Sequence, residues 1–175
     1  MSLEPLTLYK FMTLYMLNKV TFPLTNNQIS SFFLNKEYTT YFLFQQVMSE
    51  LTESKLISTE TVRNTSYYKI TPDGRETIEM FKNKIPVAII DDMDIFLYEN
   101  KYELRNEVGV ISDYYKSTNQ DYIVNCKINE GFSTLIDMNL SAPSEDLAEM
   151  MCNNWKSASE EIYKNIMKHL MKDQK

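Results

Sequence analysis

The chain has 175 residues, of which 43% are apolar and 13% aromatic, so it can bury a sizeable core. Two cysteines and one histidine exclude a zinc cluster and a disulfide framework. The net charge of −6 counts against nucleic-acid binding, because phosphate neutralisation supplies much of that affinity. No segment predicts a signal peptide or a membrane-spanning helix, so we expect a cytoplasmic globular protein without membrane association.

The charge is unevenly distributed along the chain. Residues 1–85 hold nine Lys and Arg against eight Asp and Glu, whereas residues 86–175 hold nine against sixteen, which gives net charges of +1 and −7. This asymmetry indicates units with different tasks. We expect an N-terminal domain at 1–85, a linker or dimerisation helix at 86–103, and a C-terminal domain at 104–175 for dimerisation or sensing.

Three helices are expected in the first third of the chain. Apolar residues recur at helical spacing over residues 5–18. A second, short helix at about 26–34 begins with a capping box, in which Thr25 and Gln28 stand three residues apart. A third helix at about 40–53 follows a threonine pair that can cap it.

The third helix is amphipathic. Its inward stripe has helical spacing and consists of Phe44, Val47, Met48 and Leu51. The opposite face consists of Tyr38, Thr39, Phe42, Gln45, Gln46 and Ser49. Glutamine can pair with adenine in the major groove, and an aromatic ring can contact a thymine methyl group. The polar residues also suit a solvated surface, and Phe42 also suits a dimer contact or an irregular core position.

A β-hairpin follows the third helix. The run "LISTETVRNTSYYKIT" is rich in β-branched and aromatic residues on both sides of a short polar turn. If Arg63 and Asn64 form a two-residue turn, Ile57 lies opposite Ile70 on the apolar face. A slightly longer loop fits the sequence equally well. Thr71 and the proline after it then predict the start of another helix.

This part of the chain resembles a known regulator domain. The segment from "LTESKLIS" to "YYKITPDGRETIEMF" is similar to the close of a winged helix-turn-helix domain of PadR-like and MarR-like regulators, in which the returning strand ends in Tyr-x-Leu-Thr-x-x-Gly. Tyr68, Ile70, Thr71 and Gly74 match this pattern, with Ile for Leu. The resemblance covers about the first half of the chain. Over its whole length, including "NKYELRNEVG" and "CNNWK", the sequence is similar to an uncharacterised family of winged-helix proteins with a distinct C-terminal domain.

The resemblance implies that the third helix enters the major groove and that the hairpin, as the wing, follows the DNA backbone. The candidates on the recognition helix are Tyr38, Thr39, Thr40, Phe42, Gln45, Gln46 and Ser49, and the candidates on the wing are Arg63, Asn64 and Lys69. Residues 36–70 hold only four cations, balanced by four acidic residues, which is a weak basic footprint. A winged-helix adaptor that engages a protein through Phe42 and Tyr67 therefore stands as the alternative.

The second half predicts a further helix, restarted at Pro86, and then three strands from about Leu104. The strand-like runs are "EVGVISDYY", "DYIVNCKI" and "STLIDMNL". The connections between them are short, which favours an antiparallel meander.

A long helical region, opened by Ser141, Pro143 and Ser144, is expected to about Lys172, with an apolar stripe that suits either the sheet or a dimer interface. A capping box at Ser157 and Glu160 is a candidate break in this region. We expect Trp155, the single tryptophan, to anchor the helix on the sheet.

No motif for catalysis is present, since the three glycines form no phosphate loop and no nucleophile sits beside a base in a known pattern. Asp91, Asp92 and Asp94 lack the spacing of a calcium loop, so we expect no metal and no cofactor. Both cysteines are expected to be buried apolar residues.

The sequence predicts an α+β protein: an N-terminal winged helix-turn-helix domain, followed by a small domain with a three-stranded antiparallel sheet and a long C-terminal helical region. The predicted function is regulation of transcription by a homodimer that binds duplex DNA, without enzymatic activity. The acidic C-terminal domain is the candidate site for an unknown small-molecule or protein effector.

Overall fold

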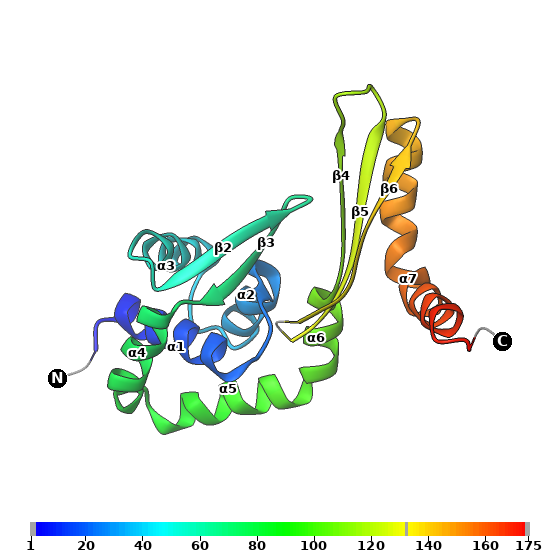
Figure 1. Ribbon diagram of the computed structural model, residues 1–175. Helices are drawn as coiled ribbons and strands as arrows, with labels where there is room; N and C mark the ends of the chain where they lie inside the picture. The colour runs from blue at the N-terminus through cyan, green and yellow to red at the C-terminus, as the bar shows by residue number, and fades with distance from the viewer. Residues whose placement is uncertain (1–2, 132, 174–175) are drawn as a thin grey trace. The chain divides into compact units, whose positions relative to one another are not determined.

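The computed structural model describes residues 3–131 and 133–173, with the backbone alone at 106 and 107. Contacts divide the chain after Val108 into two compact units, called unit 1 (residues 1–108) and unit 2 (residues 109–175). Each unit contains a three-stranded antiparallel sheet, in the order β1-β3-β2 in unit 1 and β4-β5-β6 in unit 2. The predicted α+β class is therefore confirmed (Figure 1).

Unit 1 is mainly helical, with one long hairpin (Figure 1). Its elements in chain order are α1 (Pro5–Lys19), β1 (Leu24–Thr25), α2 (Asn26–Asn35), α3 (Tyr41–Glu53), β2 (Ile57–Val62), β3 (Thr65–Ile70), α4 (Pro72–Phe81), the 3-10 helix η1 (Lys82–Lys84), α5 (Val87–Glu99) and α6 (Lys101–Gly109). Among the described residues, no helix has the length and apolarity needed to cross a membrane.

The helix starts in unit 1 follow the capping residues of the sequence. The Thr25 hydroxyl accepts a hydrogen bond from the Gln28 N–H at 3.1 Å, and the Gln28 side chain accepts one from the Thr25 N–H at 2.9 Å, which completes the predicted capping box at α2. Thr40 caps α3 through the Leu43 N–H, as expected. The predicted first three helices are therefore confirmed to within one residue at either end.

The hairpin has the predicted register, with Ile57 opposite Ile70 and Val62 opposite Thr65. The two-residue turn is formed by Arg63 and Asn64, whose φ angles of 47° and 65° both lie in the left-handed region. Two such residues in succession give a turn whose twist matches that of the strands, so the shorter of the two predicted loops is correct. The two-residue strand β1, which pairs with β3, was not predicted.

The core of unit 1 is rich in aromatic side chains. Phe32, Phe33 and Phe44 are almost completely buried, and their rings pack against one another in tilted and edge-to-face arrangements. The whole predicted inner stripe of α3 lies in this core, since Phe44, Val47, Met48 and Leu51 are all buried. The buried stripe fixes which face of α3 remains available to a partner.

The end of α3, the hairpin and the start of α4 meet at one corner. The Thr71 hydroxyl donates to the carbonyl oxygens of Lys55 and Leu56, at 2.7 and 3.0 Å, and accepts from the Gly74 N–H at 3.1 Å. A Cβ at Gly74 would lie 2.0 Å from the Leu56 oxygen, so only glycine fits there without movement. This contact holds the returning strand and the next helix against the end of α3.

The helix that follows Pro86 is present as α5, but the prediction that strands begin at about Leu104 was wrong. Helix α6 continues to Gly109, and Leu104 and Val108, one helical turn apart, are both buried in the core of unit 1. A short run of apolar and β-branched residues fits a helix and a strand equally well. Here the helix forms because it buries Leu104 and Val108 on one face. Residues 86–108 thus belong to the compact unit 1.

Unit 2 is an antiparallel meander covered on one face by a helix, as predicted (Figure 1). Its elements are β4 (Val110–Lys116), β5 (Tyr122–Glu130), β6 (Ser133–Ala142) and α7 (Glu145–Leu170). Trp155 on α7 is 3% exposed and its indole N–H donates to the Lys127 carbonyl oxygen at 3.1 Å, so it anchors the helix on the sheet.

Helix α7 continues through Ser157, so the candidate break does not occur. The apolar stripe expected along α7 is only partly covered, because Leu147 and Leu170 are exposed. Cys126 and Cys152 are both buried in the core of unit 2, as expected, and burial raises the pKa of the Cys126 thiol to about 11.

Candidate functional site

The N-terminal turn of α3 exposes aromatic side chains. Phe42 is 79% exposed and Tyr41 is 53% exposed, although Phe44, two residues further along the same helix, is buried. Ser49, two turns further along, is also exposed. The alternative that placed Phe42 in the core is therefore excluded, and an exposed aromatic ring on a helix suits a surface that binds a partner.

The two glutamines of α3 are half-buried and hydrogen-bonded within unit 1. The Gln45 amide nitrogen donates to Asn26 Oδ1 on α2 at 3.0 Å. The Gln46 amide nitrogen donates to Glu50 Oε1 at 2.9 Å, and Glu50 forms an ion pair with Lys10 at 2.5 Å. Direct contact of either glutamine with a base would require these bonds to be exchanged.

The residues that precede α3 have mainly structural contacts. The Tyr38 hydroxyl donates to Asp92 Oδ2 on α5 at 2.6 Å, and burial together with this bond raises the pKa of Tyr38 to about 12. Thr40 is the N-cap of α3. The Thr39 hydroxyl oxygen is buried and has no hydrogen-bond partner among the described residues.

The three predicted wing residues lie on one hairpin. Arg63 and Asn64 form its exposed turn, and Lys69 is exposed on β3, opposite Ser58. In Figure 1 the turn lies at the far end of the hairpin from α3 and α4. Arg63 and Asn64 therefore lie at the tip of a two-stranded arm, whereas Lys69 lies near its base, next to the Ile57–Ile70 pair.

The surface around α3 and the hairpin is nearly neutral. Lys10 is paired with Glu50, and Lys36 lies 3.5 Å from Asp92. Lys55, at the end of α3, is exposed. These ion pairs neutralise two of the lysines near α3, so less positive charge is available for phosphates than the sequence alone suggests.

The acidic cluster on α5 serves as a set of acceptors. The Tyr15 hydroxyl donates to Asp94 Oδ1 at 2.8 Å, and burial, followed by this bond, raises the pKa of Tyr15. The bond from Tyr38 lowers the pKa of Asp92. Over the part of the chain that the structure describes, no group of three or more His, Cys, Asp or Glu side chains could hold a metal ion.

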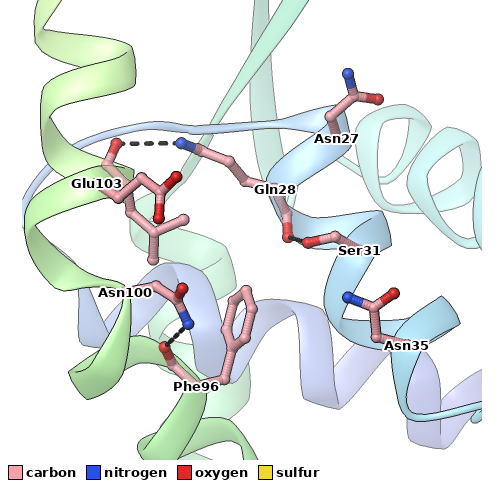
Figure 2. A pocket seen from close by; sticks show the side chains of 8 residues that line it. Asn27, Gln28, Ser31, Asn35, Phe96, Asn100 and Glu103 are labelled. Carbon is pink, nitrogen blue, oxygen red and sulfur yellow. Dashed lines mark hydrogen bonds between the residues drawn. The ribbon is translucent and has the colours of Figure 1, made fainter.

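A polar cavity of about 250 Å³, partly open to solvent, lies in unit 1 between α2, the end of α5 and α6, and Asn27, Asn35 and Glu103 on its walls are exposed. It is lined by Asn27, Gln28, Ser31, Asn35, Phe96, Asn100, Glu103 and Leu104. Figure 2 shows Asn100 and Glu103 on one side, Ser31 and Asn35 on α2 on the other, and the Phe96 ring between them.

Hydrogen bonds fix the walls of this cavity. The Gln28 amide nitrogen donates to the Leu104 carbonyl oxygen at 3.1 Å, which joins α2 to α6 (Figure 2). The Asn100 amide nitrogen donates to the Phe96 carbonyl oxygen at 2.8 Å. Sequence reasoning missed this cavity, although the spacing of Asn27, Ser31 and Asn35, four residues apart along α2, marks one wall.

Residues 9–170 of the chain match the model of a protein family described as a domain of unknown function (DUF4364). No curated protein and no solved structure matches the chain.

Proposed function

The chain belongs to the DUF4364 family, and we propose that unit 1 of this family member is a winged helix-turn-helix module that binds duplex DNA. In this proposal the protein is a cytoplasmic regulator of transcription. Helix α3 is the recognition helix, the β2–β3 hairpin is the wing, and unit 2 contributes to dimerisation or sensing.

One observation carries the proposal: a capped helix, α3, is fixed by a buried stripe on one face while its N-terminal turn projects from the surface. Recognition helices contact bases mainly through their N-terminal residues. Phe42 can pack on a thymine methyl group, and Gln45 can contact adenine if it exchanges its bond with Asn26.

The hairpin supports the same proposal. Its two-residue turn is tight, so Arg63 and Asn64 are held at the tip of a rigid arm. Such side chains suit the phosphate backbone, where contacts set position and affinity but carry little sequence information.

The low positive charge leads to a quantitative expectation. If Lys55, Arg63 and Lys69 each neutralise one phosphate, log K should fall with log salt at a slope of about −3. DNA affinity should therefore be modest and depend only weakly on salt, compared with strongly basic regulators.

The test is selection of bound fragments from a genomic library by the purified full-length protein at low salt. We expect enrichment of a defined sequence, and Gln45→Ala combined with Arg63→Ala should weaken binding by at least about tenfold. The matched control, Gln120→Ala with Arg75→Ala, changes the same residue types at exposed positions outside the surface and should bind normally. No enrichment, or unchanged binding by the first variant, would refute the proposal.

The exposure of Phe42 and Tyr41 favours a second candidate, an adaptor that binds a protein through this surface. Two exposed rings beside few cations are typical of protein interfaces rather than of phosphate contacts. In that case Phe42→Ser would abolish capture of a partner by the full-length protein, and no DNA sequence would be enriched.

We also propose a homodimer. The exposed apolar side chains Val87, Ile95 and Tyr98 lie within one face of α5, and Tyr102 is exposed on α6, which follows it. Sedimentation of the wild type should show a dimer, and Ile95→Glu with Tyr98→Glu should yield a monomer that is still folded. A wild-type monomer at micromolar concentration would contradict this part of the proposal.

A further inference from the structure

The polar cavity between α2, α5 and α6 lies outside the surface proposed for DNA. Its walls are held in place by the protein itself, because Gln28 is 5% exposed and joins α2 to α6 through the Leu104 carbonyl oxygen. The same side chain also accepts the capping hydrogen bond of Thr25. The cavity beside Gln28 is therefore held open by hydrogen bonds within unit 1.

The charge of the cavity is negative. Glu103 is the single charged residue among the eight that line it, and none of the eight is a cation. The remaining polar groups are amides and one hydroxyl, and the Ser31 hydroxyl donates to the Gln28 carbonyl oxygen at 2.8 Å. A ligand with a positive charge matches this lining, whereas a phosphate or a carboxylate would meet Glu103 without a cation to neutralise it.

Several hydrogen-bond acceptors are available to such a ligand. Within the described residues, the side chains of Asn27, Asn35 and Glu103 make no hydrogen bond or ion pair. Asn100 uses its amide nitrogen on the Phe96 carbonyl oxygen, which leaves its own side-chain oxygen as an acceptor. A guanidinium group carries several N–H donors in a plane and fits a set of amide oxygens beside a carboxylate.

The aromatic wall points to the same chemistry. The Phe96 ring lines the cavity, and its centroid lies 5.3 Å from that of Phe32, which holds the ring in place. The face of an aromatic ring attracts guanidinium and ammonium groups, and Arg-like cations most often. The alkyl part of such a ligand can pack on Leu104.

The volume sets the size of the ligand. The cavity is partly open to solvent, and its volume of about 250 Å³ lies below the roughly 300–1,000 Å³ of pockets for drug-sized ligands, so it suits a small molecule. Such a molecule is smaller than a drug-sized ligand or a nucleotide.

We propose that this cavity is a binding site for a small organic cation, an alkylguanidinium or a similar alkylamine. The cation is bound by Glu103 and the amide oxygens of Asn35 and Asn100, and it lies against Phe96. The proposal stands independently of DNA binding, since it concerns only the lining of the cavity.

The test compares two probes of the same shape, n-butylguanidinium chloride and the neutral n-butylurea, by NMR titration of the full-length protein. We expect n-butylguanidinium to shift the side-chain amide resonances of Asn27, Asn35 and Asn100, and to bind at least about tenfold more tightly than n-butylurea. Equal binding of the two probes, or shifts that sodium chloride reproduces, would overturn the proposal.

Two matched variants localise the effect. Glu103→Gln removes the charge at an exposed position and should weaken n-butylguanidinium by about tenfold without unfolding the protein. Glu99→Gln, an exposed residue on α5 outside the lining, should bind as the wild type does. Unchanged affinity in Glu103→Gln, or shifts that map to other residues, would contradict the assignment.

Discussion

Units 1 and 2 both pack helices on a three-stranded antiparallel sheet, but they bury very different cores. The core of unit 1 draws on each of its α-helices and includes a cluster of phenylalanines. In the part of unit 2 that the structure describes, the fully buried cluster is small, and Trp155 is its largest side chain. The stability of unit 1 is therefore distributed over many buried side chains, whereas in unit 2 Trp155 supplies the largest share of the fully buried apolar surface.

The difference can be measured, because Trp155 is the only tryptophan of the chain. Its fluorescence reports the unfolding of unit 2, whereas far-UV circular dichroism reports both units. For a substitution in unit 1, the fluorescence of Trp155 in unit 2 is therefore an internal reference.

The largest effect is expected from Phe44→Ala. Phe44 is completely buried and its ring centroid lies 5.5 Å from that of Phe33, so truncation should lower the unfolding free energy of unit 1 by about 3–5 kcal/mol. In urea unfolding, the circular dichroism transition should split or shift to lower urea. The Trp155 fluorescence transition should stay where it is. An equal shift of both signals would show that the two units unfold as one.

A smaller loss, of about 1–3 kcal/mol, is expected from Gly74→Ala. In an ordinary helix this change stabilises, but here the new Cβ would lie 2.0 Å from the Leu56 oxygen and 2.9 Å from Ile70 Cγ1. The same urea experiment checks it, with Asp73→Ala, an exposed neighbour, as the control. A stabilised Gly74→Ala protein would mean that α4 can move away from the end of α3.

A weaker, pH-dependent effect is expected from Tyr38→Phe. The phenol donates to Asp92, with Lys36 also facing that carboxylate, and the pKa of Tyr38 is raised to about 12 from its ordinary value near 10. The folded state therefore favours the protonated phenol. This stabilisation is complete below pH 10 and is lost between pH 10 and 12.

Unfolding midpoints of the wild type and Tyr38→Phe, measured from pH 7 to pH 12, check this expectation. The variant should be the less stable protein at neutral pH, by less than Gly74→Ala, and the gap should narrow above pH 10. A gap that does not change with pH would exclude the phenol bond as its source.

The smallest effect on stability is expected from Phe42→Ser. Because Phe42 is 79% exposed, the unfolding free energy should change by less than about 0.5 kcal/mol in either direction. Binding to DNA or to a protein partner should nevertheless fall by at least about tenfold. A strong loss of stability would instead show that Phe42 is a structural residue.

The local structure of unit 1 followed from short-range chemistry. The caps at Thr25, Thr40 and Thr71 and the spacing of the α3 stripe each depend on residues within one or two turns, so the sequence was sufficient to predict them. The register of the hairpin followed in the same way, because a slip by one residue would expose Ile57.

The errors came from long-range contacts. Whether Leu104 continues a helix depends on the core it meets, and the bond from Gln28, 76 residues away in sequence, leaves no local signal. The candidate site shows the same limit. The exposure of Phe42 could be predicted from helical periodicity, but the bonds of Gln45 to Asn26 and of Tyr38 to Asp92 join separate elements that periodicity cannot pair.

The corner at Thr71 and Gly74 also limits which substitutions this part of the sequence can tolerate. The Thr71 hydroxyl forms hydrogen bonds with three backbone groups. Pro72 occupies the first turn of α4, and Gly74 leaves room for the Leu56 oxygen. Each position is restricted for a separate reason, so a compensating change elsewhere cannot relieve all of them. We therefore expect distant relatives to retain Thr71, Pro72 and Gly74 more often than the residues around them, whereas residue 73 should vary.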